Sequence, residues 1–325
     1  MKAMVYTKTG TLDVLQIKDI SKPIPKDNQV LISVKASALS ITDYERFKTS
    51  SNKAPFSIKM TSSLMGFIGA PIGAEISGVV VEIGKNITHV KIGDKVYGKT
   101  AGMFPKGGFA EYALMDKERV FLKPENLSFE QASAISISFE TALGALRKGK
   151  VKAGQQIMIY GASGGVGLYA VQLAKVMGAT VTGVCSTRNI DLAKQMGCDY
   201  VIDYKKEDFT KTTSKYDAII GINGCNSMKV YKKLLTSNGI FVGVGNAKQG
   251  FMAMFASLTS KNITYFAGPM MPQKDYLSYA KDLAEAGKLI PYIDKIYSVK
   301  NTREAIQYIV TTHVQGKVVV TMDFE

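Results

Sequence analysis

The apolar residues follow two different patterns, and the change between them divides the chain. Residues 1–121 hold short β-branched runs, such as VLISVKAS and ISGVVVEIG, separated by turn-forming segments such as KPIPKDNQ. This pattern predicts a β-rich domain with little helix. Between residues 122 and 268, strand-like runs alternate with helix-like stretches, as where IMIY precedes GLYAVQLAKVMG. The alternation predicts an α/β fold with βαβ units and a doubly wound parallel sheet.

A glycine-rich segment, GASGGVG at residues 161–167, lies directly after one predicted strand and directly before a predicted helix. Small residues there permit a tight turn and let backbone N–H groups at the positive helix end approach a pyrophosphate. The segment therefore predicts a dinucleotide-binding loop, although its pattern is AxGxxG and a turn needed only for helix and sheet packing is the alternative. The candidate cofactor-binding residues of this loop are Gly161, Ala162, Ser163, Gly164, Gly165, Val166 and Gly167.

The residues after the next predicted strand indicate which dinucleotide is preferred. An NAD site usually has an acid at this position, which accepts a hydrogen bond from the ribose 2′-hydroxyl. The chain has Ser186, Thr187 and Arg188 there, and its next carboxylate, Asp191, already lies in a helix-like stretch. Hydroxyl and guanidinium groups suit a 2′-phosphate, so the segment favours NADPH. The alternative is an ordinary helix start with Ser or Thr as the cap and the arginine in solvent.

Composition and charge fit a soluble enzyme of two domains. The chain has 325 residues, a hydrophobic content of 46% and a formal net charge of +14. Such a charge could serve nucleic acid, an anionic membrane surface or a phosphate-bearing ligand, but the lysines are scattered singly or in pairs. Attraction for a phosphorylated ligand is therefore the favoured interpretation. No nucleic-acid partner is expected, and weak peripheral contact with an anionic membrane stays open.

Cysteine spacing and the amino-terminal residues indicate the compartment. Cys185, Cys198 and Cys225 are widely spaced and form no CxxC pair, so neither a disulfide framework nor a structural zinc site is indicated. A reducing compartment fits this spacing. The first residues, MKAMVY, enter a strand-like pattern without a long apolar stretch, so we expect no targeting segment and predict a cytoplasmic location.

Several motifs together carry a family resemblance. They are GDKVYG at 93–98, GGFAEY at 107–112, LSFEQASA at 127–134, GASGGVG at 161–167, and then CSTRN and VIDY. In this order, and over nearly the whole chain, they resemble the zinc-independent quinone oxidoreductase branch of the medium-chain dehydrogenase/reductase superfamily. The resemblance implies a GroES-like catalytic domain of residues 1–121 and 269–325, with a Rossmann NADPH-binding domain inserted at residues 122–268. It also implies a homodimer joined through the strand at residues 262–268.

The resemblance also bears on the metal. Zinc members of the superfamily bind the catalytic metal through a Cys, a His and a later Cys, and the corresponding positions here resemble Ser40, Ala74 and Ile137. None of these side chains is suited to bind zinc, so a metal-free site is expected. Hydrogen bonds alone would then polarise the substrate carbonyl. This suits hydride addition to quinones or α,β-unsaturated carbonyls better than reduction of an unactivated ketone.

The candidate catalytic residues lie in one short segment and are Ser40, Thr42, Asp43 and Tyr44. The resemblance places Ser40 where zinc-free relatives often have Asn, Thr42 at a proton-relay position and Asp43 at a commonly matched acid. Tyr44 is a candidate proton donor, because a phenol can act as a general acid. The alternative is that Ser40 and Asp43 only fix the loop, while water supplies the proton.

Further cofactor contacts come from the resemblance alone. Thr141 resembles a threonine beside the nicotinamide, the segment Val244-Gly245-Asn246 resembles the strand end that lines it, and Tyr204 resembles a tyrosine near the adenosine phosphate. Ordinary strand-end roles remain the alternative for Tyr204 and for the Val244 segment.

Together, these features predict a zinc-independent, NADPH-dependent oxidoreductase that transfers hydride to small hydrophobic quinones or enones. The alternative is an NADPH-binding structural or membrane-surface partner with little turnover, since a fold alone does not prove chemistry. The physiological substrate stays open, because the segments at 49–72 and 250–271, which should shape the pocket, have no readable chemistry.

Overall fold

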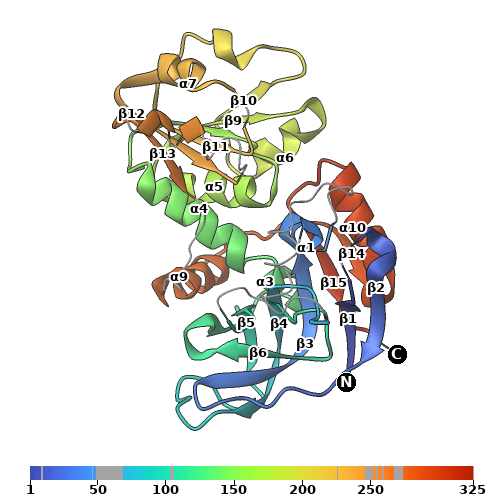
Figure 1. Cartoon of the computed structure of the whole chain (residues 1–325). Helices are drawn as coiled ribbons and strands as arrows, with labels where there is room; N and C mark the ends of the chain where they lie inside the picture. Colours follow the sequence, from blue (N-terminus) through green and yellow to red (C-terminus); the bar gives the residue numbers. More distant parts are fainter. Residues whose placement is uncertain are drawn as a thin grey trace. The chain divides into compact units, whose positions relative to one another are not determined.

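The computed structural model describes two units of one chain (Figure 1). It describes residues 1–8, 10–45, 47–48, 69–102, 106–224, 226–245, 252–253, 255–257, 260–266 and 274–324. The first unit comprises Met1–Ser136, Leu277–Asp282 and Ile293–Glu325, and the second comprises Ile137–Tyr276 and Leu283–Tyr292. The division falls after Ser136 and not after residue 121, because the segment that follows residue 121 packs on the first unit: the Ser77 hydroxyl donates to the Phe129 carbonyl at 2.5 Å.

The first unit is β-rich. Its strands are β1 (Lys2–Tyr6), β2 (Leu15–Asp19), β3 (Gln29–Leu39), β4 (Glu75–Ile83), β5 (Lys95–Lys99), β6 (Tyr112–Asp116), β7 (Val120–Leu122), β14 (Ile293–Ser298) and β15 (Lys317–Thr321). Its helices are α1 (Ile41–Glu45), α3 (Phe129–Ser133) and α10 (Thr302–Thr311). Strands β1 and β2 pair with each other, and the others form a seven-stranded sheet in the order β14-β15-β3-β4-β5-β7, with β6 paired to β3.

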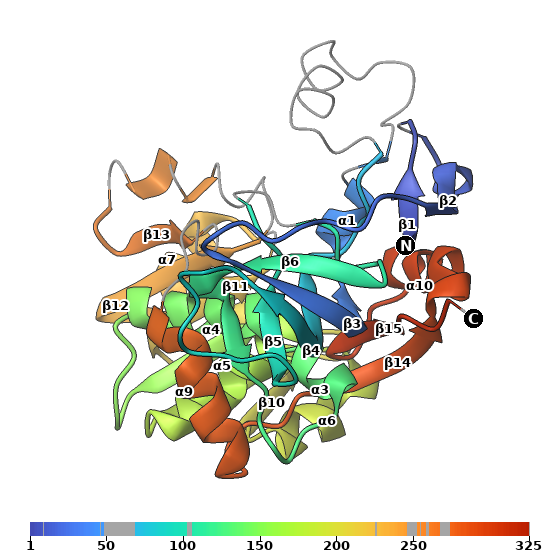
Figure 2. The same ribbon diagram turned by 90° about the horizontal axis from the view of Figure 1, so that it is seen from below.

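The long strand β3 organises this sheet and ends at the candidate catalytic segment. It pairs antiparallel with β15, β4 and β6, and Figure 2 shows β6 lying along it. The tail of the chain therefore completes the seven-stranded sheet beside β3, as the register of Leu39 with Val318 shows. Tail residues such as Ile306 and Val320 also share one buried cluster with Phe109.

The second unit is a parallel sheet covered by helices. Its strands are β8 (Gln156–Tyr160), β9 (Thr180–Cys185), β10 (Tyr200–Asp203), β11 (Tyr216–Ile222), β12 (Leu235–Val244) and β13 (Ile263–Phe266). Its helices are α4 (Ser136–Lys148), α5 (Gly165–Val176), α6 (Ile190–Gln195) and α7 (Met228–Leu234), while the residues of α9 (Lys274–Glu285) are divided between the two units. All pairings in the order β10-β9-β8-β11-β12-β13 are parallel.

This topology confirms the predicted doubly wound α/β fold. Successive strands extend from β8 to β10 on one side and from β11 to β13 on the other, so the order reverses between β8 and β11. Ligands of such sheets bind beyond the carboxyl ends of the strands at this reversal. Strand β12 begins at Leu235, where it already pairs with Tyr216, and a register shift follows before Ala218 pairs with Ile240.

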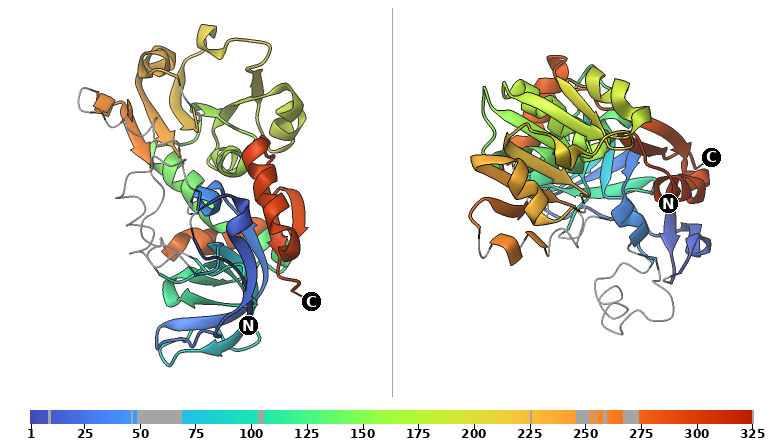
Figure 3. Two further views of the ribbon diagram at one scale, coloured as in Figure 1. Left: turned by 45° about the vertical axis from the view of Figure 1, so that its right-hand side comes forward. Right: turned by 90° about the horizontal axis from the view of Figure 1, so that it is seen from above.

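Helices cover both faces of the parallel sheet (Figure 3). On one face, the residue after α4 lies so close to the sheet that a Cβ at Gly149 would meet Ile220 at 3.3 Å, and the Phe139 ring of α4 lies 6.1 Å from the Tyr169 ring of α5. On the other face, the Tyr231 ring of α7 stacks on Phe241 at 4.2 Å. Among the described residues, no helix is long and apolar enough to cross a membrane.

Candidate active site

The glycine-rich loop joins β8 to α5, and different physical constraints act on its glycines. Gly161 has a φ of 80°, a conformation that L side chains rarely adopt. A Cβ at Gly167 would lie 2.0 Å from the Gly161 carbonyl oxygen, so close packing requires this glycine. Gly164 is different, because the nearest atom to a Cβ at this position would be the Gly161 carbonyl oxygen, 3.7 Å away. The packing alternative thus accounts for Gly161 and Gly167 but not for Gly164.

The start of α5 offers backbone donors to an anion. Gly164 is the N-cap, it supplies no side-chain hydrogen bond, and the first turn holds no acidic residue. No side chain of that turn therefore neutralises the positive end of this 12-residue helix. The residues present fit the pyrophosphate of a dinucleotide, because open space at Gly164 permits close backbone approach.

The segment after β9 carries the residues expected near the adenosine. Ser186 is half-buried, while Thr187 and Arg188 are exposed at the 3-10 helix Thr187–Asn189. Ser186 is the N-cap of this helix but makes no side-chain capping hydrogen bond. The helix-cap alternative therefore does not account for Ser186, and its role and that of Arg188 stay predictions.

A carboxylate that the sequence interpretation missed lies beside this segment. The Thr187 hydroxyl donates to Asp203 Oδ2 at 2.7 Å, and the Lys205 N–H donates to Asp203 Oδ1 at 3.0 Å. Burial opposes ionisation of Asp203, but these hydrogen bonds and the charge of Lys206 outweigh it and lower the pKa of Asp203. The hydroxyl of Thr187 is thus committed to a carboxylate. The neighbouring Tyr204 is half-buried against the core.

Asp203 could be found only from strand pairing. It ends β10 and lies opposite Cys185, the last residue of β9. The VIDY motif had drawn attention to Tyr204 alone, since an acid was sought at the end of β9 itself. In a doubly wound sheet β10 is expected beside β9, and this expectation would have placed an acid at the end of β10 next to the adenosine segment.

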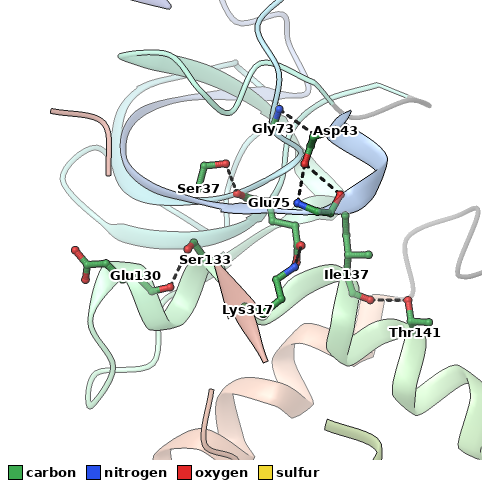
Figure 4. Close-up of polar contacts among 10 residues, drawn as sticks. Ser37, Asp43, Gly73, Glu75, Glu130, Ser133, Ile137, Thr141 and Lys317 are labelled. Atoms are coloured by element: carbon green, nitrogen blue, oxygen red, sulfur yellow. Dashed lines mark hydrogen bonds and ion pairs between the residues drawn. The ribbon is translucent and has the colours of Figure 1, made fainter. Parts of the chain in front are cut away.

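The residues predicted near the nicotinamide lie on α4 and after β12. Thr141 on α4 is 8% exposed, and its hydroxyl donates to the Ile137 carbonyl at 2.6 Å, as Figure 4 shows. Val244 ends β12 and is buried, Gly245 has a φ of 88°, and Asn246 lies outside the described residues. A residue not singled out from the sequence, Asn223, has a φ of 53° at the end of β11 and donates its N–H to the Val244 carbonyl at 3.0 Å.

The candidate catalytic segment begins where β3 ends. Asp43 is 1% exposed and its Oδ2 accepts from the Ser40 N–H at 2.9 Å and the Ser40 hydroxyl at 3.1 Å. Its Oδ1 accepts from the Gly73 N–H at 3.2 Å (Figure 4). These contacts favour the alternative in which Asp43 fixes the loop. Thr42 is exposed and Tyr44 is half-buried, so their side chains remain the candidate donors.

Packing holds Tyr44 in place. Its ring meets Phe47 edge to face at 5.7 Å, and the Lys48 ammonium lies 5.2 Å from the ring centre. Phe47 belongs to the buried cluster of the β-rich unit, against which Tyr44 packs. An anchored phenol loses little conformational freedom when it donates to a substrate, so the structure gives Tyr44 a fixed position without testing its predicted role.

A buried ion pair anchors the end of β3 from both sides. Glu75 begins β4 and Lys317 begins β15, and their charged groups lie 2.6 Å apart with side-chain exposures of 1% and 8%. These strands flank β3, where Ala38 pairs with Glu75 and Leu39 with Val318. The pair therefore holds the strand end that leads into Ser40. The sequence interpretation named only the neighbouring Ala74, as the position that resembles the histidine ligand of zinc members.

Neither the described thiols nor the described acidic and histidine side chains form a reactive or metal-binding group. Burial raises the pKa of Cys185 to about 11 and that of Cys198 to about 12, so both remain protonated at neutral pH. Cys225 lies outside the described residues. In the part of the chain that the structure describes, no group of three His, Cys, Asp or Glu side chains could hold a metal ion. A zinc-free reaction stays a prediction.

Fold and site define a class of protein, an oxidoreductase that combines a GroES-like unit with a dinucleotide-binding unit. The domain family described as "Alcohol dehydrogenase GroES-like domain" matches residues 26–125, and "Zinc-binding dehydrogenase" matches residues 196–320. The chain is 33% identical to 2-methylene-furan-3-one reductase of Solanum lycopersicum and 32% identical to the chloroplastic NADPH-dependent alkenal/one oxidoreductase of Arabidopsis thaliana. Each match covers 98% of this chain and 79% of the relative.

A solved structure shows the same architecture over nearly its whole length. The quinone oxidoreductase from Coxiella burnetii matches with a TM-score of 0.87 and 31% identity, covering 98% of both chains. The chain therefore belongs to the quinone oxidoreductase branch of the medium-chain dehydrogenase/reductase superfamily, which confirms the resemblance found in its motifs.

Proposed function

We propose that this protein is a zinc-independent reductase that uses NADPH to reduce quinones or α,β-unsaturated carbonyl compounds. The observation that carries the proposal is the open Gly164 at the positive end of α5, because packing does not explain it and a bound pyrophosphate does. The names of the relatives support the substrate class, since they specify a 2-methylene-furan-3-one, alkenals or alkenones, and a quinone. They do not favour a binding protein with little turnover.

Each unit contributes a separate task to this chemistry. When bound, a nicotinamide cofactor supplies a hydride. Backbone N–H groups at Gly165 and Val166, in the first turn of α5, would hold its pyrophosphate, and Ser186 and Arg188 would hold the 2′-phosphate. Thr42 and Tyr44 would donate hydrogen bonds to the substrate oxygen, on which negative charge develops. A conjugated acceptor spreads that charge, so hydrogen-bond donors suffice.

The candidate donors can be tested one at a time. Tyr44→Phe and Thr42→Val each remove a donor to the substrate and not to the cofactor, so kcat/KM for an enone should fall about 10 to 100-fold. The Kd of NADPH should remain nearly unchanged. Steady-state kinetics and cofactor titration measure the two quantities. Full activity of both variants would mean that water supplies the proton and that these assignments are wrong.

The preference for NADPH over NADH rests on the segment after β9. A guanidinium can meet the nearly doubly charged 2′-phosphate with two charge-assisted hydrogen bonds, while NADH offers a neutral hydroxyl. Arg188→Ala should therefore weaken NADPH about ten to several hundred-fold and leave NADH nearly unaffected. The buried carboxylate of Asp203 acts in the opposite direction, because it repels the same phosphate. Equal Kd values for both cofactors in the unchanged protein would contradict the proposal.

The metal-free reaction has its own test. We expect the purified protein to contain less than stoichiometric zinc and to keep its activity after dialysis against a chelator, because Ser40, Ala74 and Ile137 offer no strong ligand. Elemental analysis and an activity assay before and after dialysis measure this. Stoichiometric zinc together with loss of activity to the chelator would refute it.

Assembly through β13 is a further part of the proposal. This strand lies at one edge of the parallel sheet, where a second copy could pair with it and form a homodimer. Light scattering on a sizing column tests this, and a monomer at micromolar concentration would contradict it. The cytoplasmic location likewise stays a prediction.

Peripheral contact with an anionic membrane would use exposed lysines of the second unit. They are Lys205, Lys206, Lys211, Lys215, Lys229, Lys232 and Lys233. Lysines near an anionic surface contribute about 1 kcal/mol each, an attraction that salt screens. Sedimentation with phosphatidylglycerol vesicles at low salt should then exceed sedimentation with phosphatidylcholine vesicles. Equal sedimentation with both would dismiss this contact.

A further inference from the structure

We propose that Asn189 is a positioning residue that ties together the two cofactor loops and makes Ser163 and Ser186 hydrogen-bond donors for the dinucleotide. The proposal rests on the proposed function, because it needs a dinucleotide as the ligand. Nothing in the sequence pattern singled out Asn189, which follows Arg188 at the end of the 3-10 helix. Its position becomes informative only in the folded second unit.

One buried amide spans the two loops. Asn189 is 3% exposed, and its Nδ2 donates to Ser163 Oγ at 2.8 Å and to Ser186 Oγ at 3.1 Å. Ser163 lies in the glycine-rich loop between β8 and α5, and Ser186 lies after β9. The loop expected to hold the pyrophosphate is thereby fixed to the segment expected to hold the 2′-phosphate.

The direction of these hydrogen bonds decides what the serines can do. An amide NH2 group only donates, so each serine oxygen must accept, and each serine keeps its own hydrogen for another acceptor. Among the residues that the structure describes, neither hydroxyl donates a hydrogen bond. Phosphate and ribose oxygens can accept such a bond. The amide therefore presets two neutral donors at the place where an anionic ligand is expected.

The neighbouring threonine shows the opposite arrangement. The Thr187 hydroxyl gives its hydrogen to the carboxylate of Asp203 at 2.7 Å, so it cannot donate to a ligand at the same time. In the segment after β9, the Thr187 hydroxyl thus donates to a carboxylate, whereas the Ser186 hydroxyl accepts from an amide. A carboxylate at position 189 would engage Ser163 and Ser186 in the way that Asp203 engages Thr187.

Asn189→Asp is the sharpest test, because it keeps the side-chain shape and reverses the hydrogen bonds. The serines would then donate to the carboxylate, and the new charge would repel phosphate. We expect the Kd of NADPH, measured by calorimetric titration, to rise about 100-fold. The Kd of adenosine 2′,5′-bisphosphate, which carries only the adenosine half, should rise as well. Neither readout depends on catalysis.

Two further variants separate the donor role from mere support of the fold. Asn189→Ala should raise the Kd of NADPH about 10-fold, because it loosens the loops but leaves the serines able to donate. Asn262→Asp makes the same chemical change at the residue before β13, where Nδ2 donates to the Ser237 carbonyl at 3.2 Å. This control should leave the Kd unchanged.

The outcomes distinguish this inference from the proposed function. If the unchanged protein binds NADPH and Asn189→Asp binds it equally well, the inference is wrong and the function stands. If the unchanged protein binds no nicotinamide dinucleotide, both fail. Should Asn189→Asp not fold, Ser163→Ala and Ser186→Ala replace it. A rise of about 3 to 10-fold in the Kd for each would support the inference, and unchanged binding by both would overturn it.

Discussion

Lys317→Met should lower the free energy of unfolding of the β-rich unit by about 3 to 5 kcal/mol. The reason is that Glu75, a carboxylate with an exposed side-chain fraction of 1%, would lose a counter-charge. The Lys317 ammonium lies 2.6 Å from it and helps to make its burial tolerable. Urea-induced unfolding followed by circular dichroism measures the change.

An exposed ion pair of the same unit provides the matched control. Lys22 and Glu82 lie 2.8 Å apart with side-chain exposures of 43% and 45%, so Lys22→Met should lower the free energy of unfolding far less than Lys317→Met. Lys317→Met combined with Glu75→Gln should recover part of the lost stability, because the buried negative charge that Lys317 balanced is then removed as well. If Lys317→Met costs no more than Lys22→Met, water reaches Glu75 and the pair does not anchor the end of β3.

Gly167→Ala and Gly164→Ala should both weaken NADPH binding, but only Gly167→Ala should also lower stability. The new Cβ at position 167 would lie 2.0 Å from the Gly161 oxygen and 2.8 Å from the Ala162 carbonyl carbon, and both are backbone atoms. Helix α5 must therefore shift, at a cost of about 1 to 3 kcal/mol or more, and binding of NADPH should be lost with it. Thermal unfolding and cofactor titration measure the two effects.

The Gly164 variant should keep its stability within about 1 kcal/mol, since the new Cβ meets nothing closer than 3.7 Å. Its Kd for NADPH should nevertheless rise about 10-fold or more, because a methyl group would occupy the space through which the backbone approaches the pyrophosphate. If Gly164→Ala binds NADPH as tightly as the unchanged protein, the close approach is disproved. If Gly164→Ala and Gly167→Ala lose stability equally, the loop glycines are needed only for packing.

Much of the fold could be read from local patterns. The alternation of apolar runs and helical stretches gives βαβ units, and the glycine cluster between β8 and α5 marks the turn that the structure shows. The extent of β12 was less readable, because Leu235 becomes a strand residue only by pairing with Tyr216. Such pairing is a tertiary contact, and tertiary contacts override local propensity.

The parts of the site that depend on distant residues could not be read in this way. Glu75 and Lys317 are 242 positions apart, and only the register of β4, β3 and β15 brings them together. Asp203 reaches Thr187 because β10 pairs with β9, and Asn189 reaches Ser163 across two loops. A single sequence shows which side chains are available, whereas burial and hydrogen-bond partners decide which of them fix the loops.

Consumption of NADPH by the purified protein tests the central claim most directly. The assay uses three acceptors, namely a naphthoquinone, an alkyl vinyl ketone and a saturated ketone, with NADH as the parallel cofactor. The account predicts rapid consumption of NADPH with the quinone or the vinyl ketone, none with the saturated ketone, and slower reactions with NADH. Consumption with none of the acceptors, or with the saturated ketone alone, would contradict it.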